Sequence, residues 1–259
     1  MFICSDPIFY YFALQYTIYS NEFLDKVIVI GENLKKIPEI CIYMHDARLF
    51  YQITRKFRAE DIPFIALDDL SRFHRNWRVL ITTSDDVEKI SPFWYSSITV
   101  LEVNSHDNPD QILLRTFVYL KNLQNFHTMT IGIDPGKRLT GVAVFFDDVF
   151  VYSREITNLA DLYQYIILAF QTFPTQMKVI KIGDGVINLT KKYIRRLMQG
   201  EDIKNHSEIL LVNETNTTKR PYNGNHKLTS KHEKAAMFIG RRPAHQVLNY
   251  PRTKKGKKC

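Results

Sequence analysis

The 259-residue sequence predicts an α/β protein made of two folded domains and a basic tail. In residues 1–126, short β-rich segments alternate with segments of helical periodicity, which is typical of a small parallel α/β domain. Residues 127–240 predict the order β-β-β-α-β-α-β-α, a mixed sheet with helices. Residues 241–259 contain seven Lys and Arg and no acid, so they carry almost all of the formal net charge of +8.

The first domain is predicted to contain five strands, and the alternation with helices favours a parallel sheet. The strands are expected at 26–30, 40–44, 63–67, 78–82 and 98–103, and the main helices at 7–19, 47–58 and 109–123. Gly31 is the only glycine before Gly132, so no glycine-rich phosphate loop is present. His45 and Asp46 follow a strand, where α/β domains place ligands, but the stronger interpretation is that Asp46 caps the next helix. We therefore interpret residues 1–126 as a partner or substrate platform.

The second domain places an acid after three of its strands. Strands are expected at 128–133, 140–146, 149–153, 178–182 and 208–212, with helices at 159–173, 189–198 and 231–239. Asp134 follows the first strand, Asp184 the fourth and Glu214 the fifth. If these strands are parallel neighbours, their carboxyl ends lie at one edge of the sheet. His232 and Glu233, in the first turn of the last helix, could reach the same edge.

Such an acidic cluster would repel itself unless cations bind to it. Carboxylates are preferred ligands of Mg²⁺ and Mn²⁺, and two such ions are the usual arrangement for phosphodiester cleavage. Each residue also has an ordinary structural interpretation. Asp134 and Asp184 could be turn residues, Glu214 a loop acid, and His232 a helix N-terminal residue without a ligand.

Three short motifs resemble the RuvC-like branch of the RNase H-like superfamily. GIDPG at 132–136 is similar to the first RuvC motif, and DPGKRLTGVAV resembles the corresponding segment of YqgF-type proteins. NETNTT at 213–218 is similar to the second YqgF motif, with Glu214 as its acid, and KHEKAA at 231–236 resembles the last family motif. Asp184 occupies the place of the second RuvC acid. The RuvC pattern would put a further acid at Ala235, so the last ligand is either His232 or Glu233.

The resemblance implies an RNase H-like fold, a metal site that holds two Mg²⁺ or Mn²⁺ ions, and hydrolysis of phosphodiester bonds. The implied substrate is branched DNA such as a Holliday junction, or structured or ribosomal RNA if the YqgF-like features dominate. Asp134, Asp184, Glu214 and Glu233 would bind metal, and His232 or Glu233 would complete the site or move protons. A fused N-terminal domain is not part of the ordinary architecture and looks like an archaeal form. The rival interpretation is a non-catalytic module that binds nucleic acid or a protein.

Basic side chains near the predicted site suit contacts with phosphates, although each could be an ordinary solvated residue. They are Lys137, Arg138, Lys191, Lys192, Arg195, Lys219 and Arg220, in addition to the tail. Symmetric cleavage of a junction would require two sites and therefore a homodimer. Three widely spaced cysteines favour a reducing, cytoplasmic location. No segment reaches the ~20 apolar residues that a transmembrane helix needs, so no membrane association is expected.

Overall fold

The computed structural model describes residues 27–30, 38–71, 73–214 and 230–249. The chain divides into two compact units, Met1–Leu120 and Lys121–Cys259. The helix expected at 7–19, the loop that contains Lys219 and Arg220, and the last ten residues of the basic tail lie outside the described residues. No described helix has the length and hydrophobicity needed to cross a membrane.

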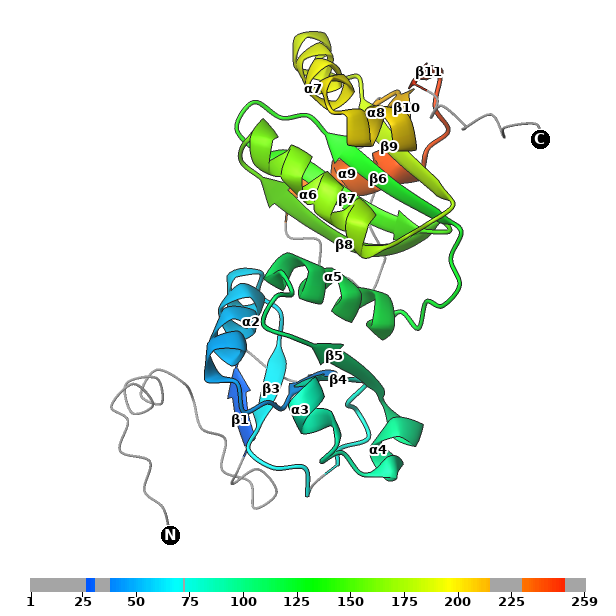
Figure 1. Ribbon diagram of the computed structural model, residues 1–259. Helices are drawn as coiled ribbons and strands as arrows, with labels where there is room; N and C mark the ends of the chain where they lie inside the picture. The colour runs from blue at the N-terminus through cyan, green and yellow to red at the C-terminus, as the bar shows by residue number, and fades with distance from the viewer. Residues whose placement is uncertain (1–26, 31–37, 72, 215–229, 250–259) are drawn as a thin grey trace, which may run out of the picture. The chain divides into compact units, whose positions relative to one another are not determined.

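The first unit contains a five-stranded sheet in the order β1-β3-β2-β4-β5 (Figure 1). The strands are β1 (Val27–Ile30), β2 (Ile40–Ile42), β3 (Phe64–Leu67), β4 (Val79–Thr83) and β5 (Thr99–Val103). Strands β2 to β5 run parallel, as predicted. The expectation of an entirely parallel sheet is wrong for β1, which pairs antiparallel with β3 at the edge. An edge strand has only one neighbour, and the sheet tolerates either direction there.

Helices cover both faces of this first sheet, because successive side chains of each strand point to opposite sides. On one side, Phe64 of β3 contacts Phe57 of α2 (Ala47–Ala59), and α2 packs on α5 (Pro109–Leu120). On the other side, Ile65 belongs to a buried cluster with Trp77 and with Trp94 of α4 (Pro92–Ser97). The short α3 (Ser84–Val87) directly follows β4.

The second unit contains a six-stranded sheet in the order β11-β10-β9-β6-β7-β8. The strands are β6 (Thr128–Asp134), β7 (Thr140–Phe146), β8 (Val149–Ile156), β9 (Met177–Gly183), β10 (Glu208–Val212) and β11 (Gln246–Asn249). Strands β6, β7 and β8 form an antiparallel meander, and β6, β9 and β10 run parallel. The first five strands thus have the mixed arrangement of an RNase H-like fold, which confirms the predicted fold class.

The sixth strand is a correction, because the sequence was interpreted as a flexible tail from residue 241. Helix α9 extends over Lys231–Arg241, and β11 then pairs antiparallel with β10, with Val247 opposite Leu210. The seven Lys and Arg of residues 241–259 favoured a solvated tail, although none of them lies in the segment that forms the strand. Residues 243–251 contain no Lys or Arg, and the pairing supplies hydrogen-bond partners to the outer edge of β10.

The helices of the second unit lie on both faces of its sheet, with α6 (Leu159–Thr172) and α9 on opposite sides (Figure 1). Asn158 caps α6 as predicted, since its side chain accepts a hydrogen bond from the Asp161 amide. Helices α7 (Ile187–Gln199) and α8 (Glu201–His206) connect β9 to β10. Helix α9 contacts β6, β7 and β8, and its first turn approaches β7 at Gly141. A Cβ at Gly141 would overlap the His232 carbonyl, so this glycine allows His232 to lie against the sheet.

Candidate functional site

Three acids follow three neighbouring parallel strands at one edge of the second sheet. Asp134 is the last residue of β6, Asp184 directly follows β9, and Glu214 lies two residues after β10. The backbone joins two of these ends: the Asp184 amide donates to the Val212 carbonyl at 3.1 Å. The Glu214 amide in turn donates to Asp184 Oδ1 at 3.2 Å. The strand order therefore places the three acids at the same edge of the sheet.

The Glu214 carboxylate lies against the backbone of the turn that holds Asp184. A Cβ at Gly183 would overlap Glu214 Oε1, and a Cβ at Gly185 would overlap Oε2. Oε1 is buried and has no hydrogen-bond partner among the residues that the structure describes. The pKa of Glu214 is raised from 4.5 to about 7, first by burial and then by the charges of Asp134 and Asp184, against a backbone hydrogen bond from Gly185 and the charge of His232. Glu214 is therefore a half-buried acid with one buried oxygen, and the charges of the other two acids act on it.

Asp134 is paired with His232 from the first turn of α9. The imidazole Nδ1 lies 2.7 Å from Asp134 Oδ2, and Asp134 is only 8% exposed. Burial raises the pKa of Asp134, and the hydrogen bond and charge of His232, with the charge of Lys231, oppose this. The charge of Glu155 raises the pKa as well.

Glu155 on β8 also lies near Asp134, although no local pattern in the sequence marks it. Asp134 pairs with Gly141 on β7, and Gly141 pairs with Glu155 on β8, so the two acids share one register and one face of the sheet. This register depends on the hairpin and on a shift between Val144 and Phe145, which local sequence patterns do not reveal.

Glu233 was expected to bind metal, but its buried carboxylate contacts a different strand. Ser153 on β8 donates to Glu233 Oε2 at 2.8 Å. The Glu233 amide donates to the Oγ of Ser230, the N-cap residue of α9. Consecutive helical residues point about 100° apart, so only one of the pair His232 and Glu233 can face the end of β6. The structure gives that position to His232.

His245 is a second histidine at this edge, and sequence analysis missed it. Its Nε2 lies 3.5 Å from Asp184 Oδ2, and its amide donates to the Leu211 carbonyl at 3.0 Å, just before β11 begins. No motif marks this histidine, because its position depends on the pairing of β11 with β10. The site thus contains two carboxylate–imidazole pairs, with Glu214 beside Asp184.

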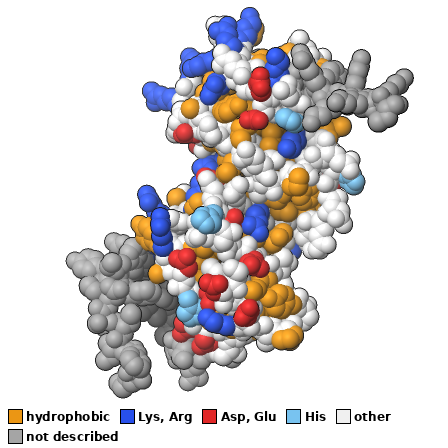
Figure 2. Space-filling model, viewed as in Figure 1, with side chains coloured by type: hydrophobic (Ala, Val, Ile, Leu, Met, Phe, Trp, Pro, Cys, Tyr) orange, Lys and Arg blue, Asp and Glu red, His pale blue; other side chains and the backbone are white. Residues whose placement is uncertain are grey.

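Exposed basic side chains lie on two elements near these acids. Lys137 and Arg138 are exposed in the turn between β6 and β7. The outward face of α7, which follows Asp184, carries exposed Lys191, Lys192 and Arg195. Figure 2 shows Lys and Arg side chains gathered on the part of the second unit around α7. These groups could contact a phosphate backbone, while Lys219 and Arg220 are not among the described residues.

The donor atoms at the site suit a hard divalent ion, because carboxylate oxygens dominate and Glu214 Oε1 is buried without a partner. Among the described residues, no group of three His, Cys, Asp or Glu side chains lies close enough together to hold one metal ion. The acids are instead joined in pairs through His232, His245 and the Glu214 amide. The chemistry of the residues fits a metal ion.

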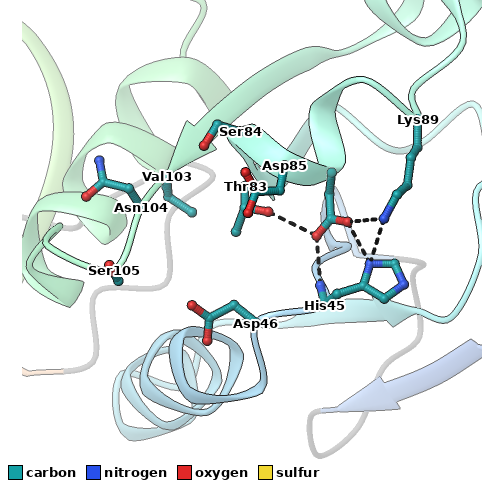
Figure 3. A pocket seen from close by; sticks show the side chains of 10 residues that line it. His45, Asp46, Thr83, Ser84, Asp85, Lys89, Val103, Asn104 and Ser105 are labelled. Carbon is teal, nitrogen blue, oxygen red and sulfur yellow. Dashed lines mark hydrogen bonds and ion pairs between the residues drawn. The ribbon is translucent and has the colours of Figure 1, made fainter.

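The first unit has its own polar pocket of about 260 Å³, lined at the carboxyl ends of β2, β4 and β5 (Figure 3). Asp46 lines it and also accepts a hydrogen bond from the Leu49 amide, which confirms its role as an N-cap. The buried Asp86 carboxylate accepts hydrogen bonds from four groups: Lys89 Nζ, the His45 amide, His45 Nδ1 and Thr83 Oγ1. Burial acts to raise the pKa of Asp86, but these hydrogen bonds hold it well below its usual value. Asp86 therefore joins the residues that follow β2 to the end of β4.

The sequence matches no protein-family model and no curated protein. The structure is similar to "T. thermophilus RuvC in complex with Holliday junction substrate", with 8% identity, a TM-score of 0.35, and coverage of 44% of this chain and 91% of that chain. It is also similar to "Thermus thermophilus RuvC structure", with 7% identity, a TM-score of 0.33 and the same coverages.

Proposed function

We propose that this chain is a metal-dependent endonuclease that hydrolyses phosphodiester bonds in nucleic acid. The observation that carries the proposal is the position of Glu214, a half-buried acid whose pKa is raised to about 7 by burial and by the charges of Asp134 and Asp184. Holding Glu214 close to two other acids costs folding free energy, because the charges of Asp134 and Asp184 disfavour its ionisation. A cation-binding role gives a physical reason for that cost.

Asp134, Asp184 and Glu214 would hold the metal ions, with His232 next to Asp134. Two Mg²⁺ or Mn²⁺ ions would activate a water molecule and stabilise the leaving oxygen. His232 orients the Asp134 carboxylate through its 2.7 Å contact. The buried environment of Glu214 keeps its unpartnered Oε1 away from water, which strengthens its attraction to a cation.

The substrate proposed for this site is branched DNA, with structured RNA as the alternative. The resemblance of GIDPG to the RuvC motif favours a four-way junction, and the resemblance of NETNTT to the YqgF motif favours RNA. Lys137, Arg138 and the exposed basic face of α7 would hold the phosphate backbone in either case. Cleavage of a symmetric junction would also require a homodimer.

The proposal is tested by incubating the purified full chain with Mg²⁺ or Mn²⁺ and each of three labelled substrates. These are a four-way DNA junction, a linear DNA duplex and a structured RNA. We expect cleavage of one branched or structured substrate, loss of cleavage in Asp134→Asn, and wild-type cleavage in Asp148→Asn. Asp148 is a matched control, because it is an exposed turn residue of the same unit and undergoes the same chemical change. If the wild-type chain binds these substrates but cleaves none of them, the non-catalytic interpretation is correct and the nuclease proposal is wrong.

A further inference from the structure

Residues 242–249, here called the C-terminal strap, lie beyond the five strands of the RNase H-like sheet and contact the candidate site at two points. The strap begins where α9 ends and continues into β11, which pairs with β10. Its path is fixed by backbone contacts, because the Arg242 carbonyl accepts a hydrogen bond from Lys181 Nζ at 2.8 Å. The His245 amide donates to the Leu211 carbonyl. These contacts do not depend on the strap side chains.

The first contact is made by Arg242. Its guanidinium Nη1 donates to the Asn213 carbonyl at 2.7 Å, directly before Glu214 in the chain. The peptide that follows Asn213 donates its N–H to Asp184 Oδ1. Arg242 therefore holds the turn from which the Glu214 side chain projects.

The second contact is made by His245, whose Nε2 lies 3.5 Å from Asp184 Oδ2. The other oxygen of this carboxylate, Oδ1, accepts the Glu214 amide. Each oxygen of the Asp184 carboxylate therefore has one polar group beside it, and the two contacts favour one orientation of the carboxylate. Without His245, the outer oxygen would face solvent, because the Asp184 side chain is 33% exposed.

We infer that the C-terminal strap orients the residues that bind the divalent ion. In this role His245 positions Asp184, and Arg242 positions the turn that contains Asn213 and Glu214. This inference rests on the proposed metal-dependent function. Groups that orient metal ligands commonly change metal affinity by about 10- to 100-fold when they are removed. The strap would thus pre-organise two of the three acids, whereas His232 orients the third.

The test measures Mn²⁺ binding by the full chain without nucleic acid, by titration calorimetry. We expect His245→Leu to weaken Mn²⁺ binding about tenfold or more, and His245→Gln, which keeps an N–H donor, to recover most of the affinity. Arg242→Gln should weaken binding in the same direction. In cleavage assays, both defects should decrease as the Mn²⁺ concentration rises, with the KM for nucleic acid unchanged.

Two control variants make the same substitutions at an arginine and a histidine that do not contact the site. Arg241→Gln removes the same charge one residue earlier, where the side chain lies over the Phe145 ring. His206→Leu replaces an exposed histidine at the end of α8. Both should bind Mn²⁺ as the wild type does. Wild-type Mn²⁺ affinity in His245→Leu and Arg242→Gln would overturn the inference, while loss of cleavage in Asp134→Asn would keep the proposed function. If the wild-type chain binds no Mn²⁺, both the inference and the proposed function fail.

Discussion

The raised pKa of Glu214 predicts that the metal-free second unit becomes less stable as the pH rises through neutrality. The native state holds the Glu214 proton up to about pH 7, whereas the unfolded chain releases it near 4.5. Between these two values the native state binds more protons, so the free energy of unfolding falls with pH. Glu214→Gln should remove this dependence, because Gln resembles the protonated acid in shape and cannot ionise.

The size of the effect follows from the two pKa values. A shift from 4.5 to about 7 corresponds to about 3 kcal/mol once the native acid is fully ionised, near pH 8. At pH 5 the difference is below about 1 kcal/mol. We therefore expect Glu214→Gln to unfold with nearly the wild-type free energy at pH 5. At pH 8 we expect the variant to be more stable than the wild type by about 2–3 kcal/mol.

The assay is urea unfolding with a chelator at pH 5 and pH 8, followed by far-ultraviolet circular dichroism and by tryptophan fluorescence. Both tryptophans, Trp77 and Trp94, belong to the first unit, so the fluorescence transition is an internal control that the substitution should leave unchanged. Adding Mn²⁺ at pH 8 should stabilise the wild type and have less effect on the variant. An identical pH dependence in the two proteins would show that the pKa of Glu214 is not raised in the folded protein.

Three further predictions concern other contacts. Gly185→Ala places a Cβ on Glu214 Oε2, and because a displacement of about 1 Å can cost a hundredfold in rate, we expect such a loss of cleavage with an unchanged dichroism spectrum. Replacing the three exposed basic residues of α7 with Gln should reduce the slope of log affinity against log salt by about 3 for duplex DNA. The replaced residues are Lys191, Lys192 and Arg195. A slope equal to that of the wild type would show that α7 does not contact the DNA. Asp86→Asn should lower the free energy of unfolding of the first unit by about 2 kcal/mol at pH 7, since it weakens charge-assisted hydrogen bonds. Because the pKa of Asp86 is lowered, this difference should shrink as the pH falls below 4, and tryptophan fluorescence would detect it.

Local patterns were sufficient for most strands and long helices of the described residues and for the first ligand candidates. Alternating apolar segments located the meander β6, β7 and β8, and Asn158 marked the start of α6. The positions of Asp134 and Asp184 at strand ends followed from the same patterns. These features depend on a few adjacent residues, so they can be read from the sequence alone.

Patterns failed where the outcome depended on pairing between distant segments. The charge of residues 241–259 favoured a solvated tail, yet the uncharged segment before Arg252 pairs with β10. The same pairing brings His245 to Asp184 across the sheet edge. The antiparallel direction of β1 likewise depends on which edge of the first sheet it joins.

By itself the sequence determined the succession of the first five strands along the second unit and the presence of an acid after three of them. The tertiary structure decided which side chains complete the group. Helix α9 could have directed either His232 or Glu233 at Asp134, and its close approach at Gly141 selects His232. The pKa of Glu214 is also a tertiary property, because it arises from burial against Gly183 and Gly185 and from the charges of two acids on other strands.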